Sequence, residues 1–186
     1  MTKQELRIQI KKNLQTHQSS FKAESFRICK KIISSDLYKT AKIILSYMAL
    51  PDEVNLSQIL TQAQNDKKKI FIPKVYLDAE TLPKMDFFEI TQNVSLVSGS
   101  FGILEPDSSN PPFDFNNYQN ERILIFVPGR AFSKNGERLG RGKGYYDNYL
   151  KNKLPNCITV GICFPFQIVN EIPVEPHDFK MDFMFY

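Results

Sequence analysis

Residues 138–147 read R-L-G-R-G-K-G-Y-Y-D and hold the densest group of chemically useful side chains in the sequence. Glycines alternate at 140, 142 and 144, and three cations, Arg138, Arg141 and Lys143, lie between and beside them. Glycines let the backbone approach a ligand closely, and the cations donate to anionic oxygens. A buried strand is predicted before this segment and a helix after it, an arrangement that presents backbone N–H groups to phosphate. The segment therefore predicts a polyphosphate site.

This glycine segment matches neither of two familiar phosphate-binding motifs. It lacks the G-x-x-x-x-G-K-[ST] spacing of a Walker A loop, and its G-x-G-x-G spacing differs from the dinucleotide-binding G-x-G-x-x-G. A bare glycine run is equally compatible with a flexible surface turn. The interleaved cations and the flanking strand and helix favour the phosphate site.

Several charged residues have a structural interpretation beside a chemical one. Lys3 and Arg7 are four positions apart and share one helix face, which by itself is more often a solvated face. Asp147 lies in the first turn after the glycines, where a carboxylate usually complements the helix dipole; beside phosphates it can also bind Mg²⁺. The chain has only two histidines, so a zinc site is not predicted.

Two longer segments carry a resemblance to a known family. V-P-G-R-A-F at 127–132 and G-E-R-L-G-R-G-K-G-Y-Y-D at 136–147 resemble the signature of the 5-formyltetrahydrofolate cyclo-ligases, also called methenyltetrahydrofolate synthetases. Further pieces follow in the family's order: K-Q-E-L-R at 3–7, Y-M-A-L-P-D-E at 47–53, F-G-I-L-E-P at 101–106 and H-D-F-K-M-D at 177–182. The resemblance covers nearly the whole chain.

The resemblance implies an enzyme of folate one-carbon metabolism. It would convert 5-formyltetrahydrofolate to 5,10-methenyltetrahydrofolate and release ADP and phosphate, with ATP as co-substrate and Mg²⁺ as cofactor. ATP would phosphorylate the formyl oxygen on N5, and N10 would then attack the formyl carbon. This reaction needs no covalent protein nucleophile, which agrees with the absence of a recognisable Ser-His or Cys-His constellation in the sequence.

The family's functional positions carry over onto matching residues of this chain. As the catalytic group, Lys143, Arg138 and Arg141 would offset charge on the transferring phosphoryl group. The implied ATP contacts are Lys3, Arg7, Arg138, Leu139, Gly140, Arg141, Gly142, Lys143, Gly144, Tyr145 and Tyr146. The implied folate contacts are Met48, Glu53, Arg141, Gly142, Lys143, Gly144 and Tyr145. The implied metal carboxylates are Asp147 and Asp178, with Asp182 as the competitor of Asp178.

Some of these assignments leave alternatives open. Glu53 would accept from N–H groups of the pterin, although it and Asp52 are also compatible with simple solvent exposure. Phe101 is a weaker carry-over that would stack on the pterin ring. His177 is expected to lie outside the metal contacts or at the surface.

The sequence also departs from the family pattern. Ser133 stands where the family commonly has Asp, Arg130 stands where a small or apolar residue is frequent, and the chain ends in D-F-M-F-Y. These departures affect the edge of the substrate site and the final strand, not the glycine segment.

Length and composition predict one compact domain. The chain has 186 residues, 42% of them hydrophobic, and no apolar run of the ~18 residues that a membrane span needs. Its net charge of +4 is compatible with anionic substrates. The sequence has no basic stripe of the kind that is typical of nucleic-acid binding. Three cysteines without a C-x-x-C pair, and a start without an apolar leader, favour a cytoplasmic protein with reduced thiols. We expect a monomer.

Apolar patterning predicts an α/β fold, a three-layer α/β/α sandwich with a mostly parallel central sheet. Helices are expected at 3–15, 21–34 (with Phe26 and Ile33 inward), 56–64 and from 145 to about 151. Strands are expected at 41–49, 69–73, 85–90, 122–127, 157–164 and 182–186, and a loop at 98–120. The strands at 41–49 and 122–127 would deliver residues 50–53 and the glycine segment to one edge of the sheet, where ligands collect.

Two rival functions remain open at this stage. A regulator that binds folate or nucleotide without turnover would share the fold, but it would be free to lose Arg138, Lys143, Asp147 and Asp178, which are all present. An RNA-binding module would use the basic glycine segment, but it would need aromatic platforms on strands, which the sequence does not predict.

Overall fold

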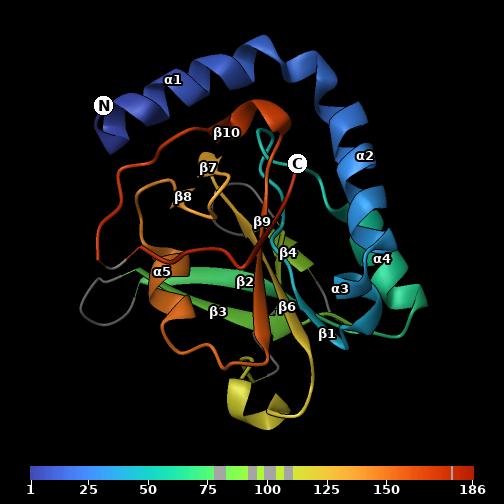
Figure 1. The fold of residues 1–186 in the computed structure, drawn as a ribbon. Helices are drawn as coiled ribbons and strands as arrows, with labels where there is room; N and C mark the ends of the chain where they lie inside the picture. The colour runs from blue at the N-terminus through green and yellow to red at the C-terminus, as the bar shows by residue number, and fades with distance from the viewer. Residues whose placement is uncertain (78–82, 92–95, 99–103, 107–110, 177) are drawn as a thin grey trace.

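The fold is built on a six-stranded sheet in the order β11-β9-β6-β1-β2-β3 (Figure 1). The structure, a computed structural model, describes residues 1–77, 83–91, 96–98, 104–106, 111–176 and 178–186. All neighbouring strands of this sheet run parallel except β2 and β3, which are antiparallel. The strands are β1 (Ile43–Leu45), β2 (Lys69–Leu77), β3 (Pro83–Glu89), β6 (Ile123–Pro128), β9 (Cys157–Ile162) and β11 (Phe183–Phe185).

The central strands are covered on both faces, which explains their continuous apolar sequences. In β6, residues 123–127 are all buried, and so are all three residues of β1. Their side chains alternate between two core clusters: Ile44 and Leu124 belong to one, Leu45 and Ile125 to the other. The predicted α/β fold with a mostly parallel sheet is confirmed, although β1 pairs over only three residues of the expected 41–49.

One face of the sheet is covered by helices α1 (Lys3–Thr16), α2 (Phe21–Ser34), α3 (Asp36–Thr40) and α4 (Ser57–Asn65). In Figure 1, α1 crosses the top of the molecule and α2 descends along its side. Helix α1 begins at a capping box, in which the Thr2 hydroxyl and the Glu5 carboxylate accept each other's backbone N–H. It buries Leu6, Ile10 and Leu14 as predicted from their spacing.

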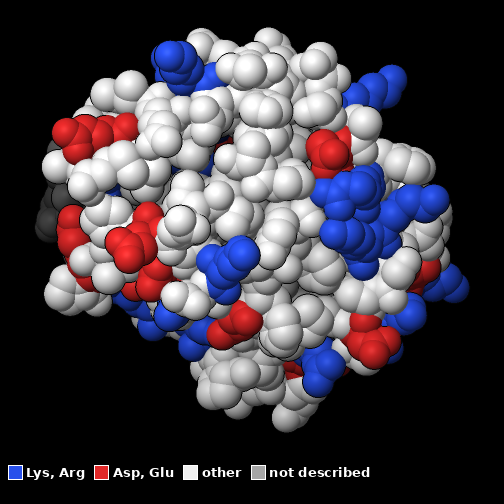
Figure 2. Space-filling view, turned by 45° about the horizontal axis from the view of Figure 1, so that its top comes forward, with Lys and Arg blue, Asp and Glu red and all other residues white. Residues whose placement is uncertain are grey.

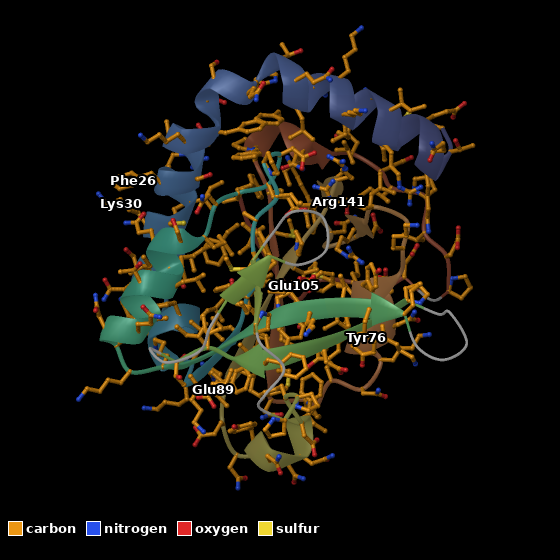
Figure 3. The ribbon with its side chains drawn as sticks, turned by 180° about the vertical axis from the view of Figure 1, so that it is seen from behind. Phe26, Lys30, Tyr76, Glu89, Glu105 and Arg141 are labelled. Carbon is orange, nitrogen blue, oxygen red and sulfur yellow. The ribbon has the colours of Figure 1, made fainter. Side chains whose placement is uncertain are left out.

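The expected inward position of Phe26 is wrong. Helix α2 buries Ser25, Ile28, Cys29 and Ile32, a stripe with helical spacing. Phe26 lies off this stripe and is 56% exposed, with the Lys30 ammonium 5.2 Å from its ring centre. Figure 3 shows both residues on the outer side of the helix. Ile33 packs partly against the core, as expected.

The opposite face carries a thinner layer. It consists of the short helix α5 (Tyr145–Leu150), the 3₁₀ turn η3 (Phe115–Tyr118) and a group of aromatic rings. Phe113 contacts both Phe71 and Phe115 edge to face, with ring centres 4.7 and 5.2 Å apart. Aromatic area therefore replaces helical area on this side.

A second, smaller sheet was not predicted. It has the order β10-β7-β8 and consists of β7 (Ala131–Ser133), β8 (Arg138–Leu139) and β10 (Ile168–Val169), preceded by the turn η4 (Pro165–Gln167). The expected strand at 122–127 is confirmed as β6, but the unpredicted β7–β8 hairpin lies between it and the glycines at 140–144. Two more short strands, β4 (Leu96–Ser98) and β5 (Leu104–Pro106), pair with each other; β5 lies inside the expected loop at 98–120, and β4 ends at its first residue.

Ser133 has a role in this hairpin. Its hydroxyl accepts hydrogen bonds from the backbone N–H groups of Asn135 and Glu137, each at 3.2 Å. A short polar side chain that accepts from N–H groups just ahead is a turn-forming interaction shared by Ser and Asp. The departure from the family's Asp thus leaves the turn intact.

The remaining expectations concern the surface and the thiols. Cys29, Cys157 and Cys163 are free and buried, as small core residues. On the face in Figure 2, lysine and arginine side chains form separate groups with acidic side chains between them. Among the described residues, no helix has both the length and the apolar composition that a bilayer crossing requires.

Candidate active site

A cavity of about 720 Å³ lies beyond the carboxyl ends of β1 and β6. Its walls come from the start of α1, the segment that follows β1, strands β2 and β3, the glycine segment, and Pro173, Glu175 and Asp178. All predicted site residues in the described part of the chain line it: Lys3, Arg7, Met48, Glu53, Arg138, Leu139, Gly140, Arg141, Gly142, Lys143, Gly144, Tyr145, Tyr146, Asp147 and Asp178. Phe101 and His177 lie outside the described residues.

Within the glycine segment, residues 140–144 form the glycine loop between β8 and α5, whose path requires glycine at two points. Gly142 has φ +96° and Gly144 has φ +71°, values that other residues rarely adopt. Gly144 is also the residue that caps α5. The loop is tied to α1, because Arg7 Nε donates to the Gly140 carbonyl at 3.0 Å. The loop and the first helix therefore form one cationic wall.

At the base of this loop, Arg138 is buried and already engaged. Its side chain is 5% exposed, with Nη2 2.7 Å from Asp147 Oδ2 and Nη1 3.3 Å from the Pro128 carbonyl oxygen. Asp147 Oδ1 also accepts from the backbone N–H of Phe179 at 3.2 Å. Arg138 thus orients Asp147, a contact that the sequence analysis did not predict because it assigned Arg138 to ATP and Asp147 to the metal.

Near the other end of the loop, Lys143 has the opposite environment. It is exposed, and it has no hydrogen bond or ion pair with any residue that the structure describes. An ammonium in this position can bind an anion without breaking an existing interaction. Of the three cations predicted to carry the chemistry, Lys143 is the one that the rest of the described protein leaves available.

The start of α1 meets the segment before the last strand. Lys3 Nζ lies 2.7 Å from Asp178 Oδ2 and 3.2 Å from Glu175 Oε1. Burial alone would lower the pKa of Lys3, but hydrogen bonds and charges from Asp178 and Glu175 raise it above its ordinary value. Glu175 was missed by the sequence analysis; its position three residues before Asp178 was the available signal.

The competitor Asp182 does not line the cavity. Its Oδ2 accepts from Lys153 Nζ at 2.9 Å, from the Thr159 backbone N–H at 2.8 Å and from the Thr159 hydroxyl at 2.7 Å. These contacts give Asp182 a structural role between β9 and the start of β11. Asp178 is the member of the pair that belongs to the cavity.

The segment after β1 joins the glycine loop through an ionic network. Arg141 Nε and Nη2 donate to Glu53 Oε1 at 3.0 and 2.8 Å, and Nη2 also bonds Asp52 Oδ1. Asp52 Oδ2 in turn bonds Arg130 Nη1. Glu53 is not simply solvent-exposed, since its side chain is only 9% exposed and its Oε2 accepts from the Leu50 backbone N–H at 3.0 Å.

The wall formed by β2, β3 and the end of β1 is mostly apolar. Met48, Val75 and Met85 line it, and Glu105 adds a carboxylate that is 4% exposed. Figure 3 shows Glu105 beside β2 and Arg141 beneath α1, both toward the middle of the molecule. Glu105 was not singled out from the sequence, although the F-G-I-L-E-P segment contained it.

Two buried polar atoms on cavity-lining residues have no hydrogen-bond partner in the described part of the chain. They are Arg138 Nε and the hydroxyl of Tyr146. Burial raises the pKa of Tyr146, so this hydroxyl remains a donor. Unpaired buried polar groups are rare in folded proteins. A ligand in the cavity would account for both.

The cavity thus has a cationic wall next to an apolar wall that carries the carboxylates of Glu53 and Glu105. Such a site suits a ligand pair of which one is polyanionic and the other is a flat heterocycle with N–H donors.

Comparisons with known proteins agree with this chemistry. Residues 1–186 match the model of the 5-formyltetrahydrofolate cyclo-ligase family. A mouse protein named 5-formyltetrahydrofolate cyclo-ligase is 29% identical over 195 residues, covering 99% of this chain and 93% of its own. A Schizosaccharomyces pombe protein named "Probable 5-formyltetrahydrofolate cyclo-ligase" is 34% identical over 172 residues, covering 86% and 82%.

A solved structure extends the similarity to the fold. The 5,10-methenyltetrahydrofolate synthetase of Aquifex aeolicus superposes with a TM-score of 0.81 at 26% identity, covering 100% of this chain and 89% of its own. The match spans both walls of the cavity, because it includes every described element. The chain belongs to the 5-formyltetrahydrofolate cyclo-ligase family and is an enzyme of folate metabolism.

Proposed function

We propose that this enzyme converts 5-formyltetrahydrofolate to 5,10-methenyltetrahydrofolate with ATP and Mg²⁺, and releases ADP and phosphate. The observation that carries the proposal is the single cavity lined by every described residue that the resemblance assigns to ATP, folate or metal. The reaction needs both substrates at one place, because the phosphoryl group passes directly from ATP to the folate. Bringing the two together is itself a large part of the catalytic work.

The cationic wall suits the triphosphate of ATP. Lys143 is available for a phosphate oxygen, and the turns at Gly142 and Gly144 expose backbone N–H groups along the loop. Arg7 reinforces this wall from α1 through the Gly140 carbonyl. In phosphoryl transfer the protein contributes mainly positioning and charge stabilisation, and these residues are of the types that do both.

Asp147 and Asp178 fit a magnesium ion shared with phosphate oxygens. Both carboxylates line the cavity and each accepts from a basic side chain, Arg138 or Lys3. In the described residues no three metal-ligating side chains form a cluster. Mg²⁺ is often held by one or two carboxylates together with substrate phosphates and water, so this donor set suits a metal that arrives with ATP. When bound, the ion would neutralise negative charge on the phosphates.

The apolar wall suits the reduced folate. Met48, Val75, Met85 and Tyr145 offer surface for a flat ring system. Glu53 offers a carboxylate for the N–H donors of the pterin edge. Arg141 occupies one oxygen of Glu53 in the structure, and a carboxylate oxygen has lone pairs for a further donor.

The chemistry follows from the weakness of a formamide oxygen as a leaving group. The formyl oxygen on N5 attacks the γ-phosphorus, the bond to the bridging oxygen of ADP breaks, and ADP departs. N10 then attacks the activated formyl carbon and loses its proton. The carbon–oxygen bond breaks, phosphate leaves with that oxygen, and a methenyl bridge joins N5 and N10. Lys143 and Arg141 would oppose the charge that accumulates on the phosphoryl oxygens.

Turnover with defined substrates tests this proposal. Purified protein is mixed with Mg·ATP and 5-formyltetrahydrofolate, and the absorbance of the methenyl product is followed. We expect product to appear in proportion to enzyme, with equimolar ADP. Reactions that lack ATP, or that contain ADP in its place, are the controls and should give no product.

A folded protein that binds ATP and the folate but forms no product would contradict the proposal. That outcome would favour the regulator.

The sequence-based expectations of a single domain, a monomer and a cytoplasmic location stay predictions. The pairing of the last strand β11 with β9, in the same sheet as β1, supports the single domain.

A further inference from the structure

Arg130, at the connection between β6 and β7, is held firmly in place. Its backbone N–H donates to the Leu139 carbonyl at 2.7 Å, and its carbonyl accepts from Gln167 Nε2 at 3.0 Å. Its side chain is 17% exposed and forms an ion pair with Asp52. A long cationic side chain with this little exposure is anchored rather than solvated.

Asp52 links Arg130 to the glycine loop. One carboxylate oxygen bonds Arg130 and the other bonds Arg141. Burial alone would raise the pKa of Asp52, but hydrogen bonds and charges from Arg141 and Arg130 lower it below its ordinary value. The carboxylate is therefore ionised at neutral pH and bridges two guanidinium groups.

Arg141 donates three hydrogen bonds to carboxylates on this side of the cavity. Its Nε and Nη2 donate to Glu53, and Nη2 donates to Asp52 as well. Nη1 makes no hydrogen bond within the described part of the chain. Because a guanidinium is rigid and planar, fixing Nε and Nη2 also fixes the direction of Nη1.

Such fixing has a clear energetic reason. The Arg141 side chain is 34% exposed and projects from a glycine-rich loop, so by itself it would sample many rotamers. Ordering a long side chain only when substrate binds costs conformational entropy. Supporting contacts that hold a catalytic side chain beforehand avoid that cost.

We infer that Arg130 and Asp52 are positioning residues that hold the Arg141 guanidinium in its working orientation. Arg130 anchors Asp52, Asp52 and Glu53 orient Arg141, and Arg141 acts on the transferring phosphoryl group. The inference rests on the proposed function. It assigns a role to Arg130, which stands where a small or apolar residue is frequent in the family.

A double-mutant cycle tests this chain of contacts. The variants are Arg130→Met, which keeps the length of the side chain but removes its charge, Arg141→Ala, and the two combined. We expect Arg130→Met to lower kcat about 10-fold while the KM values for ATP and folate change less than about 3-fold. In the Arg141→Ala background, adding Arg130→Met should change kcat less than about 2-fold, because the group that it positions is already absent.

Two further variants separate positioning from folding. Arg130→Lys, which keeps the charge, should recover most of kcat, and Asp52→Asn should reproduce the Arg130→Met pattern even if Arg130→Met folds poorly. Arg122→Met is the matched control: Arg122 bonds the Thr40 hydroxyl at 2.7 Å, and neither residue lines the cavity. It should leave kcat unchanged.

Active wild-type enzyme with unchanged kcat in Arg130→Met and Asp52→Asn would overturn the inference alone. So would losses that multiply in the double variant, because they would show that Arg130 does not act through Arg141. A folded wild-type protein without turnover would overturn the proposed function and this inference with it.

Discussion

The two ends of the glycine loop use positive charge in opposite ways. At the base, Arg138 is buried and bonds Asp147 and the Pro128 carbonyl. Toward the far end, Lys143 is exposed and has no partner among the described residues. Both cations come from one short stretch of sequence, and both were assigned to ATP phosphates by resemblance. Their environments give them different roles: Arg138 holds local structure, and Lys143 stays available for a ligand.

The difference shows why the type of a residue does not define its role. A buried guanidinium with a carboxylate partner fixes local geometry, and removing it leaves an unpaired buried charge. An exposed ammonium contributes little to packing and remains available for a ligand. We therefore expect changes at the base of the loop to affect stability first, and changes near its far end to affect turnover alone.

The largest expected effect is on turnover at Lys143. Lys143→Ala should lower kcat about 10³-fold, equivalent to ~4 kcal/mol, because it removes a charge aimed at the phosphoryl group. Its free energy of unfolding should stay within about 0.5 kcal/mol of wild type. Initial rates and urea denaturation of the same preparation give both values. Near-normal kinetics would remove Lys143 from the site.

The next largest effect is on stability at Arg138. Arg138→Leu should lower the free energy of unfolding by about 3 kcal/mol, because it leaves Asp147 and the Pro128 carbonyl without the donor that they share. Urea denaturation measures the loss, with Lys143→Ala as the control from the same loop. If the two variants were equally stable, the division between base and far end would be wrong.

A smaller effect is expected on metal dependence at Asp147. Asp147→Asn should raise the Mg²⁺ concentration needed for half-maximal rate about 10-fold, because a neutral amide is a weaker ligand for a hard cation. Rates measured across a magnesium titration at fixed ATP provide the test. Asp182→Asn, outside the cavity, is the matched control. An unchanged titration for Asp147→Asn would contradict its assignment to the metal.

The smallest effect concerns acid stability. Burial raises the pKa of Asp52, but Arg141 and Arg130 outweigh it and the net pKa is below its ordinary value of 3.8. A carboxyl with a depressed folded-state pKa stabilises the protein above its unfolded pKa and loses that contribution as pH falls through the folded pKa. Wild type should therefore lose stability more steeply than Asp52→Asn below about pH 4. Parallel acid-dependent slopes in urea denaturation would contradict this.

The sequence was sufficient to predict the main sheet and the residues that gather at its edge. Continuous apolar stretches such as 122–127 need burial on both sides, and alternating helices and strands then require a mostly parallel sheet. Residues after β1 and β6 meet at one edge because parallel strands end there together. The glycine spacing indicated the loop, and the resemblance to the family supplied Met48 and Glu53.

Contacts between distant segments could not be predicted in this way. The strands β7, β8 and β10 are two or three residues long, too short to leave a periodic pattern. Nothing local distinguishes the buried Arg138 from the exposed Lys143, because burial depends on Pro128 and Asp147 closing around one and not the other. The Arg130–Asp52–Arg141 network likewise joins three segments that are separated in sequence.

The ion pair between Lys3 and Asp178 spans 175 positions, and this separation has a consequence for biosynthesis. A growing polypeptide is made and exposed from its N-terminal side, so Lys3 is synthesised long before Asp178. The cavity wall that these two residues share is completed only after residue 178 has been made. Nascent chains that end before residue 178 should therefore form helix α1 and still lack this part of the cavity.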